Sequence, residues 1–396
     1  MKFPVSPLVA AVPFPPISRV KGWVAGRLFP PERPLIDLCQ AVPDYSPPSE
    51  LTGYLASLLD DPRTSRYTPD EGLPEVREAI CGRYLRLYGG LLRPEQICLT
   101  IGASQAFWLA MVTLCRAGDE VVVPLPYYFD HAMGLEALGV RMVHPPFNEG
   151  SGGLPDPEAI AALMTEKTRA ILLVTPSNPT GAITPPATLA RLLALARERG
   201  VALVLDETYH AFLPGGVRPH QLFCDPGWED HLVHIASFGK TYALTGYRAG
   251  MLAASEAFIH HALKVQDSMA VCQPRITQEA VRYGVTHLDD WVAGNGERMQ
   301  RRHDLFCAEF VRKNNPFALV ASGAFFAWVR HPSPGGGWEM ARRLAEEAHL
   351  LVLPGEAFGP GLSPYLRLAF GNIDERAIPE GVARFREFSL SRDIRR

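Results

Sequence analysis

Polar residues that could do chemistry follow several apolar segments of this sequence. Asp206 ends the run VALVLD, Asn178 lies in TPSNPTG just after another apolar run, and Lys240 lies in SFGKTYALTGYRAG, eight positions before Arg248. A carboxylate in the middle of a core would need a costly partner, so Asp206 fits better at the end of a buried strand. An amine, a carboxylate, an amide and a guanidinium in one crevice would suit proton transfer and the binding of a charged small molecule.

The elements that must position these residues are short apolar runs separated by helical segments. The helical patterns at residues 104–116 and 188–199 are followed by Gly118 and Gly200, as is typical of helix C-termini. The alternation predicts an α/β domain with a mostly parallel sheet, whose ligand sites lie in loops beyond the strand ends. The strand candidates have the nearly continuous apolar character of strands buried on both faces and lie at residues 97–101, 120–124, 170–175, 201–205 and 231–236.

From about residue 291 the sequence changes character. A charged, helix-like stretch at 296–310 precedes strand candidates at 325–329 and 365–369. We expect a second, smaller domain there, completed by the N-terminal residues, because 396 residues are too many for one simple core. The predicted division is an N-terminal arm and part of the small domain at 1–48, a large domain at 49–290 and a small C-terminal domain at 291–396.

Composition narrows the class of ligand. The formal net charge is −3 and no long basic run occurs, so nucleic acid and anionic membranes lack electrostatic support as partners. Prolines interrupt the first twenty residues, and no apolar run approaches the roughly 20 residues of a membrane helix, so we expect a cytoplasmic protein. The seven cysteines form no CxxC pair, which favours reduced, mostly buried thiols. The histidines show no metal-ligand spacing, and we predict no bound metal.

Several segments together resemble one known group of enzymes. In chain order they are SRYTPDEGLPEVREAI, TIGASQAF, PLPYYFDH, TPSNPTG, LDETYHAF, SFGKTYALTGYRAG, LPGEAFG and PYLRLAFG. In these segments, and in their order, the sequence is similar to the fold-type I aminotransferases of class I/II, which include aspartate and kynurenine aminotransferases. The resemblance implies the fold of that group, with a mostly parallel sheet sandwiched by helices in a large domain and a smaller α+β domain. It also implies pyridoxal 5'-phosphate as cofactor.

The resemblance assigns catalytic roles to residues in these segments. Lys240 is implied to hold the cofactor as a Schiff base and, once released, to move a proton between the substrate α-carbon and the cofactor. Asp206 would pair with the pyridinium nitrogen and keep it protonated. Asn178 and Tyr209 resemble the residues that hydrogen-bond the cofactor's phenolate oxygen.

Other matching residues are implied to hold the cofactor phosphate. Arg248 and Ser237 resemble phosphate ligands. The turn formed by Gly102, Ala103 and Ser104 would present backbone N–H groups at a helix N-terminus, which suits a dianion.

Two tyrosines match aromatic positions of the family. Tyr128 falls where relatives stack a ring on the cofactor, and we prefer it to Tyr127. Tyr67 matches a tyrosine that reaches the phosphate from the other subunit in relatives. That match implies a homodimer with shared active sites.

For the substrate, Arg367 matches the arginine that grips the α-carboxylate in a bidentate pair. Asn178 would also contact the substrate. The family's glycine whose backbone adds a further contact is replaced here by Ala41, which keeps the backbone donor. An amino acid and a 2-oxo acid are therefore the implied substrates.

The substrate side chain is less well defined by the sequence. Arg275 in CQPRITQEA is a candidate partner for a distal carboxylate, but we interpret it as a surface or interface arginine. A neutral, aromatic or sulfur-containing amino acid is then favoured. Phe14, Ile17 and Trp23 are candidate pocket residues, although an arm that packs on a partner would explain them equally well.

We therefore expect an aminotransferase that works through the Lys240 Schiff base and a pyridoxamine intermediate. A carbon–sulfur β-lyase or another amino-acid lyase on the same scaffold stays open, because the cofactor motifs do not separate them. A non-enzymatic regulator is disfavoured, since too few residues precede the first matching segment for a DNA-binding domain. A cofactor-free interaction protein is disfavoured by the joint presence of Lys240, Asp206 and Arg248.

Overall fold

The large part of the molecule is built around one seven-stranded sheet. The computed structural model describes residues 3–215, 217–312 and 314–393, with side chains as far as Phe388. Only β8 runs antiparallel to its neighbours, so the prediction of a mostly parallel sheet is confirmed. In spatial order the strands are β2 (Ile97–Ile101), β8 (Ala249–Ala253), β7 (Leu232–Ser237), β6 (Ala202–Asp206), β5 (Thr168–Val174), β3 (Glu120–Val122) and β4 (Arg141–Val143).

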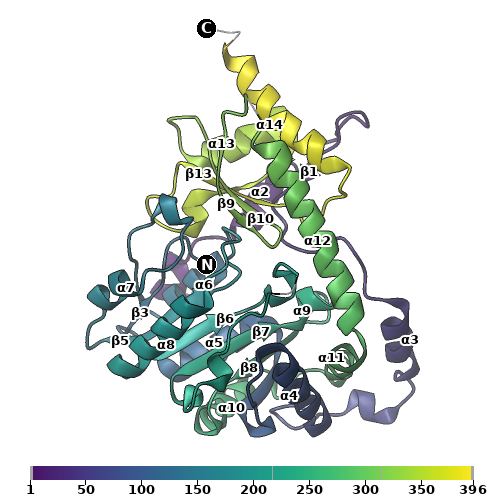
Figure 1. The fold of residues 1–396 in the computed structure, drawn as a ribbon, viewed down its shortest axis with the longest axis vertical. Coiled ribbons are helices and arrows are strands. Elements are labelled where there is room, and N and C mark those ends of the chain that lie inside the picture. The colour runs from purple at the N-terminus through teal and green to yellow at the C-terminus, as the bar shows by residue number, and fades with distance from the viewer. Residues whose placement is uncertain (1–2, 216, 313, 394–396) are drawn as a thin grey trace.

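Helices cover both faces of this sheet (Figure 1). Successive strand residues point to opposite faces, and the two faces belong to two different apolar clusters. On β6, for example, Leu203 and Leu205 join one cluster, whereas Val204 joins the other. The first cluster includes residues of α4 (Pro74–Tyr88), α8 (Pro186–Arg199) and α11 (Arg275–His287), and the second includes residues of α5 (Gly102–Leu114), α6 (Phe129–Ala137) and α10 (Glu256–Ala270).

A smaller four-stranded antiparallel sheet lies above the large one (Figure 1). A third apolar cluster joins this sheet to helices and to N-terminal residues such as Ile36 and Leu38. The N-terminal segment takes part directly, because β1 (Ile36–Asp37) pairs with β11 (Leu350–Leu351). The other elements here are β9 (Ala318–Gly323), β10 (Phe326–Arg330), β12 (Leu353–Pro354), β13 (Tyr365–Ala369), α12 (Asp289–Phe310), α13 (Gly337–Arg343) and α14 (Ala377–Asp393).

The long helix α12 connects the two sheet regions. It begins beside α11 and ends against α14, so one element runs through both (Figure 1). The domain limits at residues 48 and 290 therefore remain a prediction. Two further helices pack on the large region, α3 (Ser49–Ser57) on α11 and α7 (Pro157–Leu163) on α8.

The N-terminal arm contains two short helices, α1 (Pro7–Ala11) and α2 (Pro16–Gly22). Each begins with a proline, a residue that is tolerated in the first helical turn because its missing N–H would have no partner there. Helix α1 packs on α6 at the edge of the large region. The arm thereby reaches the same side of the sheet as the loops after its strands.

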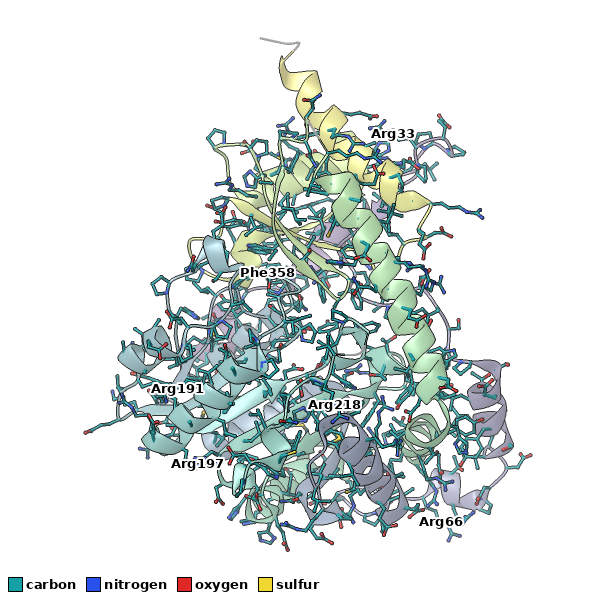
Figure 2. All side chains as sticks on the ribbon, in the orientation of Figure 1. Arg33, Arg66, Arg191, Arg197, Arg218 and Phe358 are labelled. Atoms are coloured by element: carbon teal, nitrogen blue, oxygen red, sulfur yellow. The ribbon has the colours of Figure 1, made fainter. Side chains whose placement is uncertain are left out.

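The charged side chains of α8 point to the surface, and an aromatic one lies between the two sheet regions. Arg191 and Arg197 project outward from α8, whereas Phe358 lies inside, between the two sheet regions (Figure 2). In the part of the chain that the structure describes, no helix is both long and apolar enough to cross a membrane.

The structure differs from the sequence prediction at element ends and in several strands. Helix α5 begins at Gly102 rather than residue 104, and β4, β8 and β9 are not among the predicted strands. Strand β8, with the sequence AGMLA, consists mostly of small residues and follows Arg248 without a turn signal. The pairing of β8 with β2 and β7 is a long-range contact that no local pattern encodes.

Candidate active site

The strand ends and the arm enclose a cavity of about 620 Å³. Lys240, Asp206, Asn178, Arg248 and Arg367 all line it. Asn178 follows β5, Asp206 is the last residue of β6 and Lys240 follows β7, and these three strands are adjacent in the sheet. The carboxyl ends of parallel strands meet at one edge, which is where open α/β sheets bind ligands.

Lys240 lies in the short helix α9 (Phe238–Thr241), which follows β7 directly. Ser237 begins this turn, because its Oγ accepts a hydrogen bond from the backbone N–H of Gly239 at 3.2 Å. The Lys240 Nζ donates to the carbonyl oxygen of Ala41 at 2.7 Å. Burial, reinforced by the positive charges of Arg248 and Arg367, lowers the pKa of Lys240 to about 8. The amine is therefore much closer to its neutral, nucleophilic form at neutral pH than an ordinary lysine.

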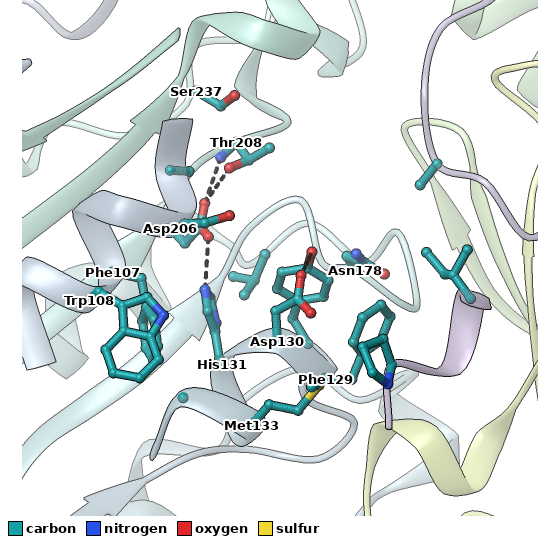
Figure 3. A pocket seen from close by; sticks show the side chains of 18 of the residues that line it. Phe107, Trp108, Phe129, Asp130, His131, Met133, Asn178, Asp206, Thr208 and Ser237 are labelled. Atoms are coloured by element: carbon teal, nitrogen blue, oxygen red, sulfur yellow. Dashed lines mark hydrogen bonds and ion pairs between the residues drawn. The ribbon is translucent and has the colours of Figure 1, made fainter. Parts of the chain in front are cut away.

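Asp206 is held in place from two sides (Figure 3). Its Oδ1 accepts hydrogen bonds from the backbone N–H of Thr208 at 2.9 Å and from the Thr208 hydroxyl at 2.7 Å. Its Oδ2 lies 3.2 Å from Nε2 of His131. The imidazole is itself stacked on Phe107, with ring centroids 4.3 Å apart. The carboxylate therefore has a fixed orientation at the floor of the cavity.

Arg367 is the central residue of β13 and is 1% exposed. Its Nη1 donates to Oδ1 of Asn178 at 3.2 Å, and its Nη2 donates to the carbonyl oxygen of Cys39. Its Nε has no hydrogen-bond partner among the described residues. Burial lowers the pKa of this guanidinium. A buried cation whose hydrogen bonds go only to neutral oxygens is suited to receive an anion from the cavity.

A second cationic end of the cavity lies at the N-terminus of α5. Gly102 has φ +74°, and a Cβ at this position would lie 2.4 Å from Nη2 of Arg248. Arg248 itself has φ +58°, a conformation that is uncommon for residues other than glycine. The glycine allows the guanidinium to lie against the helix N-terminus, where backbone N–H groups and the helix dipole favour anions. Ala103 and Ser104 of the same turn line the cavity.

Two predicted tyrosines, Tyr128 just before α6 and Tyr209 in the loop after β6, also reach the cavity. Tyr128 lines it and donates a hydrogen bond to Oδ2 of Asp130 at 2.5 Å. Tyr127 instead packs on His144 and does not line this cavity. Tyr209 lines the cavity beside Asp206, and burial raises its pKa.

Other predicted residues lie elsewhere. Tyr67 does not line the cavity and is 80% exposed. Arg275 lies outside the cavity as well, with its guanidinium 3.7 Å from the carboxylate of Glu279. Of the arm residues, Ile17 lines the cavity, whereas Phe14 is exposed. Trp23 packs edge-on against Trp338.

Sequence reasoning missed several residues of the site. His131 contacts Asp206. The sequence spacing could have identified it, because His131 lies three positions after Tyr128 at the start of α6 and so shares that helix face. Thr208 was two positions after Asp206 in a segment already recognised. Trp108 on α5 and Val9 in the arm also line the cavity, and only the tertiary fold brings them there.

Comparison with known proteins agrees with this geometry. The sequence profile described as "Aminotransferase class I and II" matches residues 33–385. The chain belongs to this family. This aminotransferase is 31% identical over 360 residues to the aromatic aminotransferase ISS1 of Arabidopsis thaliana, a match that covers 89% of each protein. It is 30% identical over 367 residues to an aspartate aminotransferase of Streptomyces avermitilis, covering 90% of this chain and 89% of the relative.

A solved structure extends the likeness to the whole fold. The aspartate aminotransferase of Rhizobium meliloti superposes with a TM-score of 0.89 at 26% identity, covering 97% of this aminotransferase and 98% of that chain. The predicted fold class, the family and the enzymatic activity are thereby confirmed. The protein catalyses pyridoxal-phosphate-dependent transamination between an amino acid and a 2-oxo acid, and these relatives do not favour the lyase alternative.

Proposed function

We propose that this aminotransferase takes the amino group from an L-amino acid with a neutral side chain, and that Lys240, Asp206, Tyr209, Asn178 and Arg367 carry the reaction. The observation that carries the proposal is the buried guanidinium of Arg367, which has no carboxylate partner among the described residues and opens on the cavity that also holds Lys240. A substrate α-carboxylate would supply the missing anion, with Asn178 beside it and the backbone of Ala41 nearby.

The residues present fit pyridoxal 5'-phosphate at both ends. Arg248, Ser237 and the start of α5 offer a cationic cradle for its phosphate, and Gly102 leaves room for the Arg248 guanidinium there. At the other end, the fixed carboxylate of Asp206 suits a protonated pyridine nitrogen. The Lys240 amine lies within the same cavity, where it would hold the group covalently.

When bound, the cofactor supplies an electron sink that stabilises negative charge at the substrate α-carbon. Lys240 would then take the proton from the substrate Cα as a general base and return it as a general acid. Its lowered pKa suits both directions near neutral pH, because the amine can release as well as accept a proton there. Asn178 and Tyr209 would donate hydrogen bonds to the cofactor's ring oxygen, and Tyr128 would stack on its ring.

The rest of the cavity wall favours a neutral substrate side chain. Its basic side chains are Lys240, Arg248 and Arg367, which all have roles above, and His131, which lies against Asp206. The carboxylate of Asp130 would repel a second substrate carboxylate. The apolar lining comes from several elements and includes Val9, Val12, Ile17, Trp108, Phe129 and Met133.

Tyr67 supports a homodimeric arrangement. It is a large aromatic residue that is 80% exposed on one chain, outside the chain's own cavity. In a homodimer it would add its hydroxyl to the phosphate site of the partner. Sedimentation analysis tests this part, because a monomeric active enzyme would remove Tyr67 from the site.

The test of the proposed function is spectroscopic. The visible absorbance of the Lys240-linked cofactor should shift to the pyridoxamine form when phenylalanine or methionine is added without any 2-oxo acid. Lys240→Ala should lack both this absorbance and turnover, while Lys264→Ala, on the exposed face of α10, should keep both. Equal turnover in the Lys240 variant would refute its role. A tenfold preference for aspartate over phenylalanine would refute the neutral substrate but not transamination.

A further inference from the structure

A cluster of nucleophilic and titratable side chains lies outside the active site, where α12 packs against β9. Cys307 and His303 are four residues apart on α12, so they share one face of the helix. The Cys307 Sγ lies 3.5 Å from Nε2 of His303 and 3.3 Å from the hydroxyl oxygen of Ser322 on β9. That hydroxyl is also 3.0 Å from the His303 Nε2. The thiol, the imidazole and the hydroxyl thus form a closed triangle of contacts.

The other ring nitrogen of His303, Nδ1, also has polar neighbours. The His303 Nδ1 lies 3.2 Å from Oδ1 of Asp304 and 3.4 Å from Nε2 of Gln300. A carboxylate at Nδ1 stabilises the protonated imidazole while Nε2 faces the thiol. This is the arrangement by which a histidine activates a cysteine as a nucleophile.

Cys307 differs from four of the other thiols in the direction in which its pKa is shifted. Burial alone would raise its pKa, but hydrogen bonds from His303 and Ser322 and the charge of His303 outweigh it, so the pKa of Cys307 is lowered. The hydrogen bond with Cys307 in turn raises the pKa of His303. By contrast, burial raises the pKa of four other cysteines, namely Cys39, Cys81, Cys98 and Cys115.

We infer that Cys307 is a second reactive centre of this protein, a thiol that His303 activates for modification by hydroperoxides and other soft electrophiles. The side chain is half-buried, which leaves it open to small reagents. With hydrogen peroxide, the thiolate sulfur attacks one oxygen and the O–O bond breaks. Sulfur is oxidised by two electrons to the sulfenic acid, and the leaving hydroxide takes the proton of the His303 imidazolium to form water.

Competitive alkylation of the holoenzyme tests this inference. A limiting amount of iodoacetamide at pH 7, followed by peptide mass spectrometry, reports the rate at each of the seven cysteines separately. Cys307 should react about tenfold faster than Cys224, because an ordinary thiol is only a few per cent thiolate at that pH. Cys224 is the internal control, since it is exposed but lacks an imidazole partner in the hydrogen bonds of the described residues.

Variants separate activation from access. His303→Gln should reduce the Cys307 rate to that of Cys224, whereas His260→Gln, at an exposed histidine of α10, should change neither rate. Peroxide followed by dimedone should label Cys307 in the wild type, and Cys307→Ser should lose that label. An unchanged Cys307 rate in His303→Gln would overturn the inference.

The pH profile of the wild-type protein provides a measurement that needs no variant. Cys307 should keep its reactivity to lower pH than Cys224, because His303 on α12 and the hydroxyl of Ser322 on β9 together outweigh the opposing charge of Asp304 on α12. Coincident profiles for the two thiols would overturn the inference even if His303→Gln failed to fold. Ser322→Ala should shift the Cys307 profile upward by a smaller amount.

Discussion

Replacing Lys240 with methionine should stabilise the apoprotein, even though it should abolish turnover. The lysine is buried among Arg248 and Arg367, and its pKa falls from 10.5 to about 8. One pKa unit corresponds to about 1.4 kcal/mol, so holding the charged amine in the fold costs about 3 kcal/mol. The hydrogen bond from Nζ to the carbonyl oxygen of Ala41 offsets about 1 kcal/mol of this cost. The net expected gain for Lys240→Met is about 2 kcal/mol at pH 7.

The sign of the pH dependence follows from the same numbers. Below pH 8 the amine is protonated in both the folded and the unfolded state, so the full cost is present. Between pH 8 and 10.5 the folded protein binds fewer protons than the unfolded one, and the cost declines as pH rises. Above pH 10.5 the amine is neutral in both states, so the wild-type protein buries no charge at this position. The advantage of Lys240→Met should therefore be largest near neutral pH and vanish in alkaline solution.

Urea unfolding of the cofactor-free proteins at several pH values, at one fixed protein concentration, measures this difference. Lys264→Met, at an exposed lysine of α10, is the matched control and should change the free energy of unfolding by less than about 0.5 kcal/mol. If Lys240→Met were as stable as the wild type, or less stable, at pH 7, then Lys240 would not be a destabilised amine. The argument for its role as a base near neutral pH would then lose its physical basis.

Three further predictions concern the site and its support. Arg367→Lys should lower kcat/KM for amino acids by roughly 10- to 100-fold in steady-state assays, because a lysine keeps the charge but loses the bidentate pair; Arg330→Ala, on the neighbouring strand, should leave it unchanged. Asp206→Asn should keep the cofactor linked but reduce kcat by about 100-fold or more, as stopped-flow traces would show. Gly181→Ala should cost more than about 2 kcal/mol in urea unfolding, since φ is +75° and the Cβ would lie 2.3 Å from the backbone of Gly323.

The sequence was sufficient for those parts of the fold that local chemistry determines. Asp206 could be placed at the end of β6 because an unpaired carboxylate is costly within a buried strand, and the structure has it as the last residue of that strand. Gly200 marked the end of α8, where it adopts φ +64°. These inferences work because each rests on a residue and its immediate neighbours.

Long-range contacts account for what the sequence could not show. Asn178 and Arg367 are 189 positions apart, and their hydrogen bond exists only because the small sheet lies over the large one. The acceptor for the second Nη of Arg367 is a backbone carbonyl, that of Cys39, which carries no side-chain signal. The arm residues Val9 and Val12 line the cavity through the packing of α1 on α6, a contact between segments more than a hundred positions apart.

The position of Asp206 also depends on the residue after it. Because consecutive strand residues point to opposite sides, Glu207 enters the core where Asp206 enters the cavity. The Glu207 Oε2 receives the Tyr88 hydroxyl at 2.8 Å and lies 3.0 Å from Nε2 of His220 and 2.8 Å from Nε2 of His234. Burial would raise the pKa of Glu207, but the two histidines outweigh it and lower the pKa well below its usual range. A charged carboxylate that is fixed by three partners in the core leaves the end of β6 little freedom. The orientation of Asp206 therefore depends on the contacts of Glu207 as well as on its own.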